Sequence, residues 1–316
     1  MQFTTKIPVQ KSTFPIDYDS KVMLLGSCFA ENMGKKFDYF KFQATTNPFG
    51  IIFNAVSLEK LIRRAVENRT FTENDIFFHN DLWHCYEVHS ELSNLDKDAF
   101  LESLNDIIRS TNKQLNESTH IIITLGTSWV YRNIETNEIV ANCHKVLQKQ
   151  FTKELLSIHQ TEESLQSIIS LIHSVNPNCN FIFTVSPVRH IKDGFAENTL
   201  SKAHLIAAIH KTITNHPSPI TYFPAYEIMM DELRDYRFYA EDMLHPSQTA
   251  IDYIWIQFFE NYISESVFGL MKEICSIQKG LQHRPFNPNT ESHQKFVLTL
   301  EEKMKRINER LPTIQF

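Results

Sequence analysis

The chain alternates short apolar runs with segments of helical spacing, and this alternation constrains its fold more than any other feature. The apolar runs cover residues 21–25, 42–46, 121–125, 181–185 and 220–223. Segments with helical spacing follow them, around residues 31–39, 58–65, 165–172, 205–213 and 247–255. Strands that alternate with helices build a mostly parallel sheet that is covered on both faces. We therefore predict an α/β fold.

Two further segments interrupt this alternation and have the pattern of β-hairpins. Residues 76–86 turn at Asn80-Asp81, and residues 130–143 turn at residues 135–138. Polar turn residues between two apolar runs are typical of hairpins. We expect both hairpins to be insertions at the edge where the strands end, so that they roof a pocket.

The end of the sequence differs from the rest. Beyond Phe268 it is helical and charged, with a break at residues 286–288. We therefore divide the chain into a domain over residues 1–268 and a C-terminal helical extension over residues 269–316. The extension is expected either to pack on the domain or to pair with a second subunit in a homo-oligomer.

Composition narrows the class of protein. Of the 316 residues, 42% are hydrophobic and 22% are charged, as in ordinary globular proteins. The net charge of −6 and the lack of a basic block argue against a nucleic-acid partner. Five scattered cysteines favour reduced thiols in a cytoplasm. With neither a signal-peptide pattern nor an apolar run of ~18 residues, we expect a soluble, cytoplasmic protein without a membrane partner.

Residue types that perform covalent catalysis stand near the ends of the predicted strands. Gly26-Ser27 follows the first strand, on a turn into a helix whose first amides would point at a ligand. Asp242 precedes His245 by three residues, just before a helix that Ser247 is expected to cap. An acid at this spacing can orient one imidazole nitrogen and leave the other to accept a serine proton. Ser27, His245 and Asp242 are therefore candidates for nucleophile, base and orienting acid.

Cys28 is an alternative nucleophile, because helix amides can lower the pKa of a nearby thiol. A free cysteine is more often a small buried apolar residue. Adjacent side chains also diverge in a strand-to-helix turn, so Ser27 and Cys28 cannot both face His245. We favour Ser27.

Other polar residues follow the strands as well. Arg189-His190 comes after the fourth strand, at the edge where substrate contacts gather in such sheets. The adjacent pairs His84-Cys85 and Cys143-His144 contain zinc-ligand types but fit no zinc-finger spacing. We expect no metal and no other cofactor.

The sequence Gly-Ser-Cys-Phe-Ala at residues 26–30 resembles the motif that names the GSCFA family, which is grouped with the SGNH (GDSL-like) hydrolases. The resemblance spans roughly Lys21 to Ala250 and includes Asp242-x-x-His245. It implies a three-layer α/β/α sandwich with a flavodoxin-like parallel sheet of about five strands. Residues 1–268 would then form an SGNH-like hydrolase domain.

The resemblance also implies roles for single residues. Ser27 would be the nucleophile, and its amide and that of Gly50 would bind the oxyanion. The third block of these hydrolases usually reads Gly-x-Asn-Asp, and its asparagine is the third oxyanion donor. This chain has Gly126-Thr127-Ser128-Trp129 in place of that block, and the candidates to replace the asparagine are Ser128, Thr127 and Asn47. His144 is expected to line the pocket.

The implied reaction is hydrolysis of a small-molecule or carbohydrate ester through an acyl-enzyme. Two alternatives stay open. The fold could serve as a binding module for an acylated ligand, with weak catalysis, which the unusual third block favours. The same triad could also transfer the acyl group to a hydroxyl instead of water.

Overall fold

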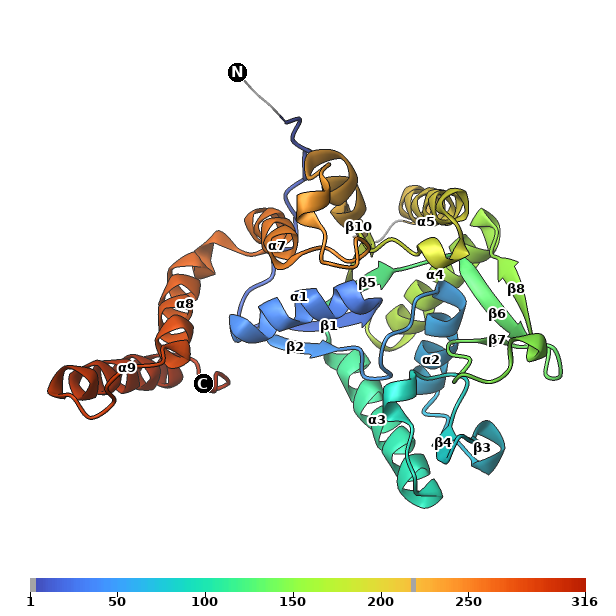
Figure 1. Cartoon of the computed structure of the whole chain (residues 1–316), viewed down its shortest axis with the longest axis horizontal. Helices are drawn as coiled ribbons and strands as arrows, with labels where there is room; N and C mark the ends of the chain where they lie inside the picture. Colours follow the sequence, from blue (N-terminus) through green and yellow to red (C-terminus); the bar gives the residue numbers. More distant parts are fainter. Residues whose placement is uncertain (1–3, 217–219) are drawn as a thin grey trace.

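The computed structural model describes residues 4–216 and 220–316, which are arranged around a five-stranded sheet (Figure 1). Its strands are β1 (Lys21–Gly26), β2 (Gln43–Thr46), β5 (His120–Leu125), β9 (Asn180–Val185) and β10 (Ile220–Phe223). All neighbours are parallel, in the order β10-β9-β5-β1-β2. This is the flavodoxin-like order, and it confirms the predicted fold class.

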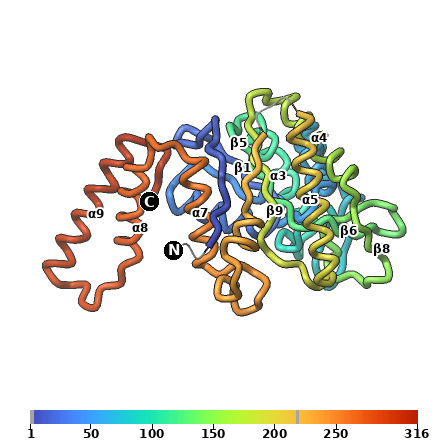
Figure 2. Tube along the Cα trace, turned by 90° about the horizontal axis from the view of Figure 1, so that it is seen from above, coloured from blue at the N-terminus to red at the C-terminus, as the bar shows by residue number. Residues whose placement is uncertain are grey.

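Alternate side chains of β1 face two separate cores. Met23 and Leu25 belong to a core that includes residues of α2, α3, α4 and α5, whereas Val22 and Leu24 belong to one that includes residues of α1 and α7. The helices are α1 (Cys28–Tyr39), α2 (Ala55–Val66), α3 (Lys97–Glu117), α4 (Ile158–Val175), α5 (Phe195–Asn215) and α7 (Gln248–Tyr262). Figure 2 shows α7 on one side of the strands and α3, α4 and α5 on the other. The three predicted layers are therefore confirmed.

Side-chain caps set where several helices begin. Ser247 accepts a hydrogen bond from the Ala250 amide, which confirms the predicted cap of α7. In α1, the Ser27 side chain accepts from the Phe29 amide, so the helix begins at Cys28 rather than near the expected Glu31. A side-chain oxygen at this position satisfies one of the free amides of the first turn.

Both predicted hairpins are present, and the second is larger than expected. Strands β3 (Phe77–His79) and β4 (Leu82–His84) pair across Asn80 and Asp81, which both have positive φ as a tight two-residue turn requires. Strands β6 (Trp129–Asn133) and β7 (Ile139–Val140) also pair, but β8 (Phe151–Leu155) joins β6 on its other side. Two central residues of β8 are exposed, so its sequence lacks the apolar signal of a strand.

Short helical turns complete the chain between these elements. Most are 3₁₀ turns, at residues 73–75, 90–92, 148–150, 191–193, 236–238 and 265–267. After β10, the short helix α6 (Ala225–Glu227) continues into a π-helical turn, Ile228–Glu232. In the part of the chain that the structure describes, no helix is long and apolar enough to cross a membrane.

The C-terminal extension consists of α8 (Phe268–Gln282) and α9 (Glu291–Arg310), which lie beyond α7 in Figure 1. Ile274, Ile277 and Ile307 are fully buried in the same core as α1 and α7. Gln278 Nε2 also donates to the carbonyl of Tyr39, at the end of α1, over 3.0 Å. The extension therefore packs on the sandwich, and its pairing with a second subunit stays a prediction.

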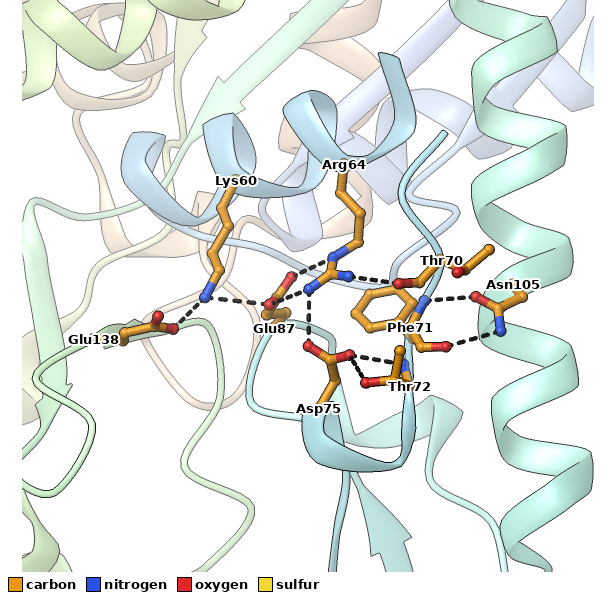
Figure 3. Close-up of polar contacts among 9 residues, drawn as sticks. All are labelled: Lys60, Arg64, Thr70, Phe71, Thr72, Asp75, Glu87, Asn105 and Glu138. Atoms are coloured by element: carbon orange, nitrogen blue, oxygen red, sulfur yellow. Dashed lines mark hydrogen bonds and ion pairs between the residues drawn. The ribbon is translucent and has the colours of Figure 1, made fainter. Parts of the chain in front are cut away.

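A buried arginine joins α2 to the chain around the first hairpin (Figure 3). The side chain of Arg64 is 4% exposed, and its guanidinium donates to both carboxylate oxygens of Glu87 over 3.0 and 2.8 Å. It also donates to Asp75 over 3.1 Å and to the Thr70 carbonyl over 3.0 Å. Its Cζ lies over the Phe71 ring, 4.1 Å from the ring centre. These contacts hold the segment that supports the second hairpin.

Candidate active site

A pocket of about 650 Å³ opens at the carboxyl edge of the sheet. Parallel α/β sheets bind ligands at this edge, next to the point where the strand order reverses. Five segments supply its lining, namely Cys28, residues 51–54, residues 127–148 around the second hairpin, residues 188–193, and Leu244-His245. The second hairpin therefore forms a wall of the pocket, as expected, whereas none of the described residues of the first hairpin lines it.

Asp242 and His245 form a hydrogen-bonded pair beside this pocket. His245 Nδ1 lies 2.5 Å from Asp242 Oδ2, and Met243 between them has φ +60°. Asp242 Oδ1 accepts from the amides of Leu244 and His245 over 2.9 and 3.0 Å. Hydrogen bonds from the His245 amide, the His245 ring and the Leu244 amide lower the pKa of Asp242 to about 2. The carboxylate therefore stays ionised near neutral pH and orients the ring, which leaves Nε2 as the proton acceptor.

Arg189 ties the loop after β9 to the Asp242–His245 turn. Its amide donates to the Leu244 carbonyl over 3.1 Å, and its Nη1 donates to the Met243 carbonyl over 3.2 Å. The guanidinium also lies 5.3 Å from the centre of the Tyr239 ring. Arg189 lines the pocket and at the same time holds the backbone that carries His245.

Ser27 lies at the predicted turn but does not line the pocket. The residue is fully buried, and its hydroxyl oxygen accepts from the Phe29 amide over 3.3 Å. Its own amide donates to the Thr124 carbonyl over 3.0 Å, and the Gly50 amide donates to the Asn47 carbonyl over 2.8 Å. Both amides that the family resemblance assigns to the oxyanion are therefore bonded within the chain.

Cys28 is the residue of this turn that lines the pocket together with His245. It is the first residue of α1 and is partly exposed. Burial raises the pKa of its thiol, and the Glu31 carboxylate raises it further, whereas the Lys202 ammonium and the first amides of α1 oppose this shift. The thiol therefore needs a base to form a thiolate at neutral pH.

The expected replacements for the third oxyanion donor lie in different surroundings. Ser128 is fully buried, and its hydroxyl donates to the Ser201 carbonyl over 3.0 Å. Thr127 lines the pocket, but its hydroxyl is 3.0 Å from that of Ser201 and accepts from the Trp129 amide. Asn47 accepts from the Gly26 amide through Oδ1 over 2.8 Å.

The Asn47 side chain also carries a hydrogen-bond donor, the amide nitrogen Nδ2. Its Nδ2 is buried and has no hydrogen-bond partner within the described residues. A buried donor without a partner costs about 1–3 kcal/mol, so such groups are rare in folded proteins. Of the three expected replacements, Asn47 is the one with a free donor beside the Gly26–Cys28 turn.

Lys202 is a feature of this site that the sequence analysis missed. Its side chain is fully buried on α5, and Nζ donates to the carbonyls of Gly126 and Ser186 over 2.7 and 2.8 Å. It thus joins the ends of β5 and β9, and burial lowers its pKa to about 7, while its interaction with Cys28 opposes this shift. The signal in the sequence is its position three residues before Leu205, on the apolar face of the helix.

His190 lines the pocket as an uncharged ring. Burial lowers its pKa to about 3, and the nearby charges of Lys202 and His245 lower it as well. Its Nε2 is buried without a partner within the described residues. A side chain at Gly126 would place Cβ 3.3 Å from this nitrogen, so glycine leaves room for the ring.

Two family models match the chain, and the larger one covers most of it. The GSCFA family model matches residues 21–258, and the model of the C-terminal domain of GSCFA domain proteins matches residues 274–316. The chain belongs to the GSCFA family. The resemblance that the sequence predicts is thereby confirmed.

Outside the GSCFA family, the chain shows only distant similarity to known proteins. No curated protein matches the chain. One similar solved structure is an acetyl xylan esterase (Est2A) from the rumen bacterium Butyrivibrio proteoclasticus, at 12% sequence identity and a TM-score of 0.30. The match covers 70% of this chain and 57% of the esterase chain, so the GSCFA chain spans less than two thirds of that protein.

In this GSCFA protein, His144 does not line the pocket as expected but is buried against the first hairpin. It is 4% exposed, and its Nε2 donates to the Cys85 carbonyl over 2.7 Å. Its ring lies 4.6 Å from that of His84, while its neighbours Asn142 and Cys143 line the pocket. Within residues 4–216 and 220–316, no three potential ligands are grouped to hold a metal ion.

His144 makes the stability of the protein depend on pH. Burial, the largest cause, lowers its pKa from 6.5 to about 4, so the unfolded chain binds this proton first as the pH falls. Stability should therefore decrease between pH 6.5 and 4, by about 2 kcal/mol at pH 5 from this residue. His144→Asn, which tolerates the local φ of +48°, should remove that part of the loss in urea unfolding at pH 7 and pH 5.

The exposed His159 on α4 is the matched control, since its side chain is 71% exposed. His159→Asn should leave the difference between the two pH values unchanged. Equal acid sensitivity of wild type and His144→Asn would contradict the prediction.

Proposed function

We propose that this GSCFA protein is an ester hydrolase of the SGNH type that works through a covalent acyl-enzyme. The observation that carries the proposal is the Asp242–His245 pair beside a pocket at the carboxyl edge of the sheet. The turn from β1 into α1 reaches the same edge and carries two nucleophilic residues, Ser27 and Cys28. The sequence favours Ser27 as the nucleophile.

The proposed reaction has two steps, and His245 acts in both. His245 Nε2 takes the proton of the nucleophile as it attacks the ester carbonyl, and then returns that proton to the departing alcohol. Asp242 stabilises the imidazolium that forms in between. His245 next takes a proton from water as the water oxygen bonds to the acyl carbon. The bond to the nucleophile then breaks, the nucleophile recovers the proton from the imidazolium, and the acid is released. Asn47 Nδ2, the free donor at the turn, is a candidate to bind the oxyanion.

The pocket supports a small-molecule or carbohydrate ester as the substrate. Its volume lies within the range of small-ligand sites, which is about 300–1,000 Å³. The aromatic side chains of Trp129 and Tyr131 line it together with polar groups from Asn142, Gln148 and Lys192. Such a mixture offers flat apolar faces and hydrogen-bond partners to an acylated ring.

Hydrolysis of a panel of esters tests the proposal. The panel consists of p-nitrophenyl esters with acyl chains of increasing length and of peracetylated monosaccharides. We expect turnover of the short acyl esters and an acyl group on the 26–30 peptide when the reaction is quenched. Wild-type protein that neither releases acid nor becomes acylated with any member would overturn the proposal. Transfer to an added alcohol, at the expense of free acid, would identify an acyltransferase instead.

A binding module for an acylated ligand is the second candidate function. It is favoured by the amides of Ser27 and Gly50, which are bonded to the carbonyls of Thr124 and Asn47 and are not free for an oxyanion. Isothermal titration with the same acetylated sugars separates the two functions. Saturable binding without any product would support the module, whereas product formation would exclude it.

A further inference from the structure

We propose that the nucleophile of this site is the thiol of Cys28, so that the covalent intermediate is a thioester. This inference rests on the proposed function, which it makes more specific. It changes the enzyme from a serine hydrolase to a cysteine hydrolase with His245 and Asp242 in unchanged roles.

The position of Ser27 argues against this residue as the attacking group. It has no exposed surface, and its oxygen accepts from the Phe29 amide as the cap of α1. An attack on a substrate in the pocket would require the side chain to leave this cap and the whole residue to become accessible. The serine therefore has a structural role that explains its residue type.

The position of Cys28 fits the role better. Cys28 follows the cap as the first helical residue, so its side chain leaves the backbone in a different direction from that of Ser27. That direction places it in the lining of the pocket, where His245 also lies. A thiol and an oriented imidazole thus line the same pocket.

The backbone determines which of the two side chains, that of Ser27 or that of Cys28, enters the pocket. The Ser27 amide donates to the Thr124 carbonyl over 3.0 Å, which continues the pairing of β1 with β5. At Gly26, which has φ +128°, an added Cβ would lie 2.1 Å from the same carbonyl oxygen. The turn therefore cannot rotate to exchange the two side chains without breaking the pairing of the central strands.

Positive charge near Cys28 suits a thiolate. The Lys202 ammonium and the first amides of α1 favour the ionised sulfur, whereas burial keeps the resting group a thiol. The thiol is thus ionised only when a base takes its proton, as in proteins that pair a cysteine with a histidine. His245 is the base in the same pocket.

The thioester route balances without any further reactant. The Sγ–H proton moves to His245 Nε2 while sulfur bonds to the carbonyl carbon, and the ester C–O bond then breaks as the alkoxide takes that proton. Water next gives a proton to His245 and bonds to the thioester carbon. The C–S bond breaks, and the thiolate recovers the proton from the imidazolium. The net reaction is ester plus water to acid plus alcohol.

Alkylation of the cysteines by iodoacetamide tests the inference without a known substrate. Cys143 is the matched control, because it lines the same pocket and burial raises its pKa to about 11. We expect Cys28 to react at least tenfold faster than Cys143 at pH 7, by peptide mass spectrometry. His245→Gln should remove most of this difference and leave the Cys143 rate unchanged. Equal rates for the two thiols, or a Cys28 rate that is the same in the wild type and in His245→Gln, would overturn the inference.

Variants then locate the acyl group on an ester that the wild type turns over. Cys28→Ala should lower kcat/KM by at least 10³-fold and abolish acylation of the 26–30 peptide. Ser27→Ala should still be acylated at Cys28, with a thioester that neutral hydroxylamine cleaves, and should lose about 2–4 °C in Tm with the cap. Acylation of Ser27 in an active Cys28→Ala variant would overturn the inference and leave the proposed hydrolysis intact. A wild type without any turnover would instead contradict the proposed function itself.

Discussion

Replacing His245 by glutamine should lower kcat/KM for ester hydrolysis by about 10³- to 10⁴-fold. Glutamine has a similar size and can still donate to Asp242, but it cannot take a proton from a nucleophile or from water. The loss should appear mainly in kcat, because both the formation and the release of the acyl-enzyme need the base. Initial rates on the preferred chromogenic ester measure it.

The control for this variant is a histidine that does not line the pocket. His159→Gln changes an exposed side chain on α4 and should leave kcat/KM unchanged. The pKa of Asp242 is about 2, so its carboxylate stays ionised in any practical assay. A His245→Gln enzyme within tenfold of the wild type would exclude His245 as the base.

Replacing Arg64 by methionine should lower the free energy of unfolding by about 3–5 kcal/mol. The variant removes the guanidinium from Glu87, whose side chain is 10% exposed, and from Asp75. Lys60, 3.2 Å from Glu87, would be the cation left beside it. Removing one partner of a buried pair is costly, because the remaining charge stays shielded from water and has lost its closest counter-ion.

Arg63 offers a control on the same helix with the same chemistry. Its side chain is 42% exposed and pairs with Glu59 over 2.8 Å. Arg63→Met should change the free energy of unfolding by less than about 1 kcal/mol, as expected for an exposed pair. Urea unfolding of both variants measures the difference. Equal small losses in the two variants would show that the Arg64 contacts in Figure 3 do not stabilise the fold.

The Arg64 cluster also connects to the pocket. Glu87 follows Tyr86, whose carbonyl accepts from the Ala141 amide over 2.8 Å. Lys60 bonds both Glu87 and Glu138, which lies on the turn of the second hairpin. The ion pairs thus anchor the hairpin wall that carries Ala141 and Asn142 into the pocket lining.

Much of the fold follows from local patterns in the sequence. Strands such as β5 and β9 are continuous apolar runs because both of their faces are buried. Helices such as α4 show one apolar face. Ser247 marks the start of α7, because its side chain accepts a hydrogen bond from the amide of Ala250, three residues further along the chain. These local patterns do not predict strand β8, because its exposed residues are held by pairing with β6 and not by burial.

The sequence by itself determined the parallel sheet, the order of its helices and the Asp242–His245 pair, because the patterns that predict each of them lie in residues that are close together along the chain. The tertiary structure alone decided which side chain of the Ser27–Cys28 turn enters the pocket, and it alone revealed Lys202 and Arg64 as buried charges. These features depend on partners far away in the sequence, such as Thr124 for the turn and Gly126 for Lys202. Hydrogen bonds to distant backbone groups and the exclusion of water exist only once the strands have met, so no local pattern encodes them.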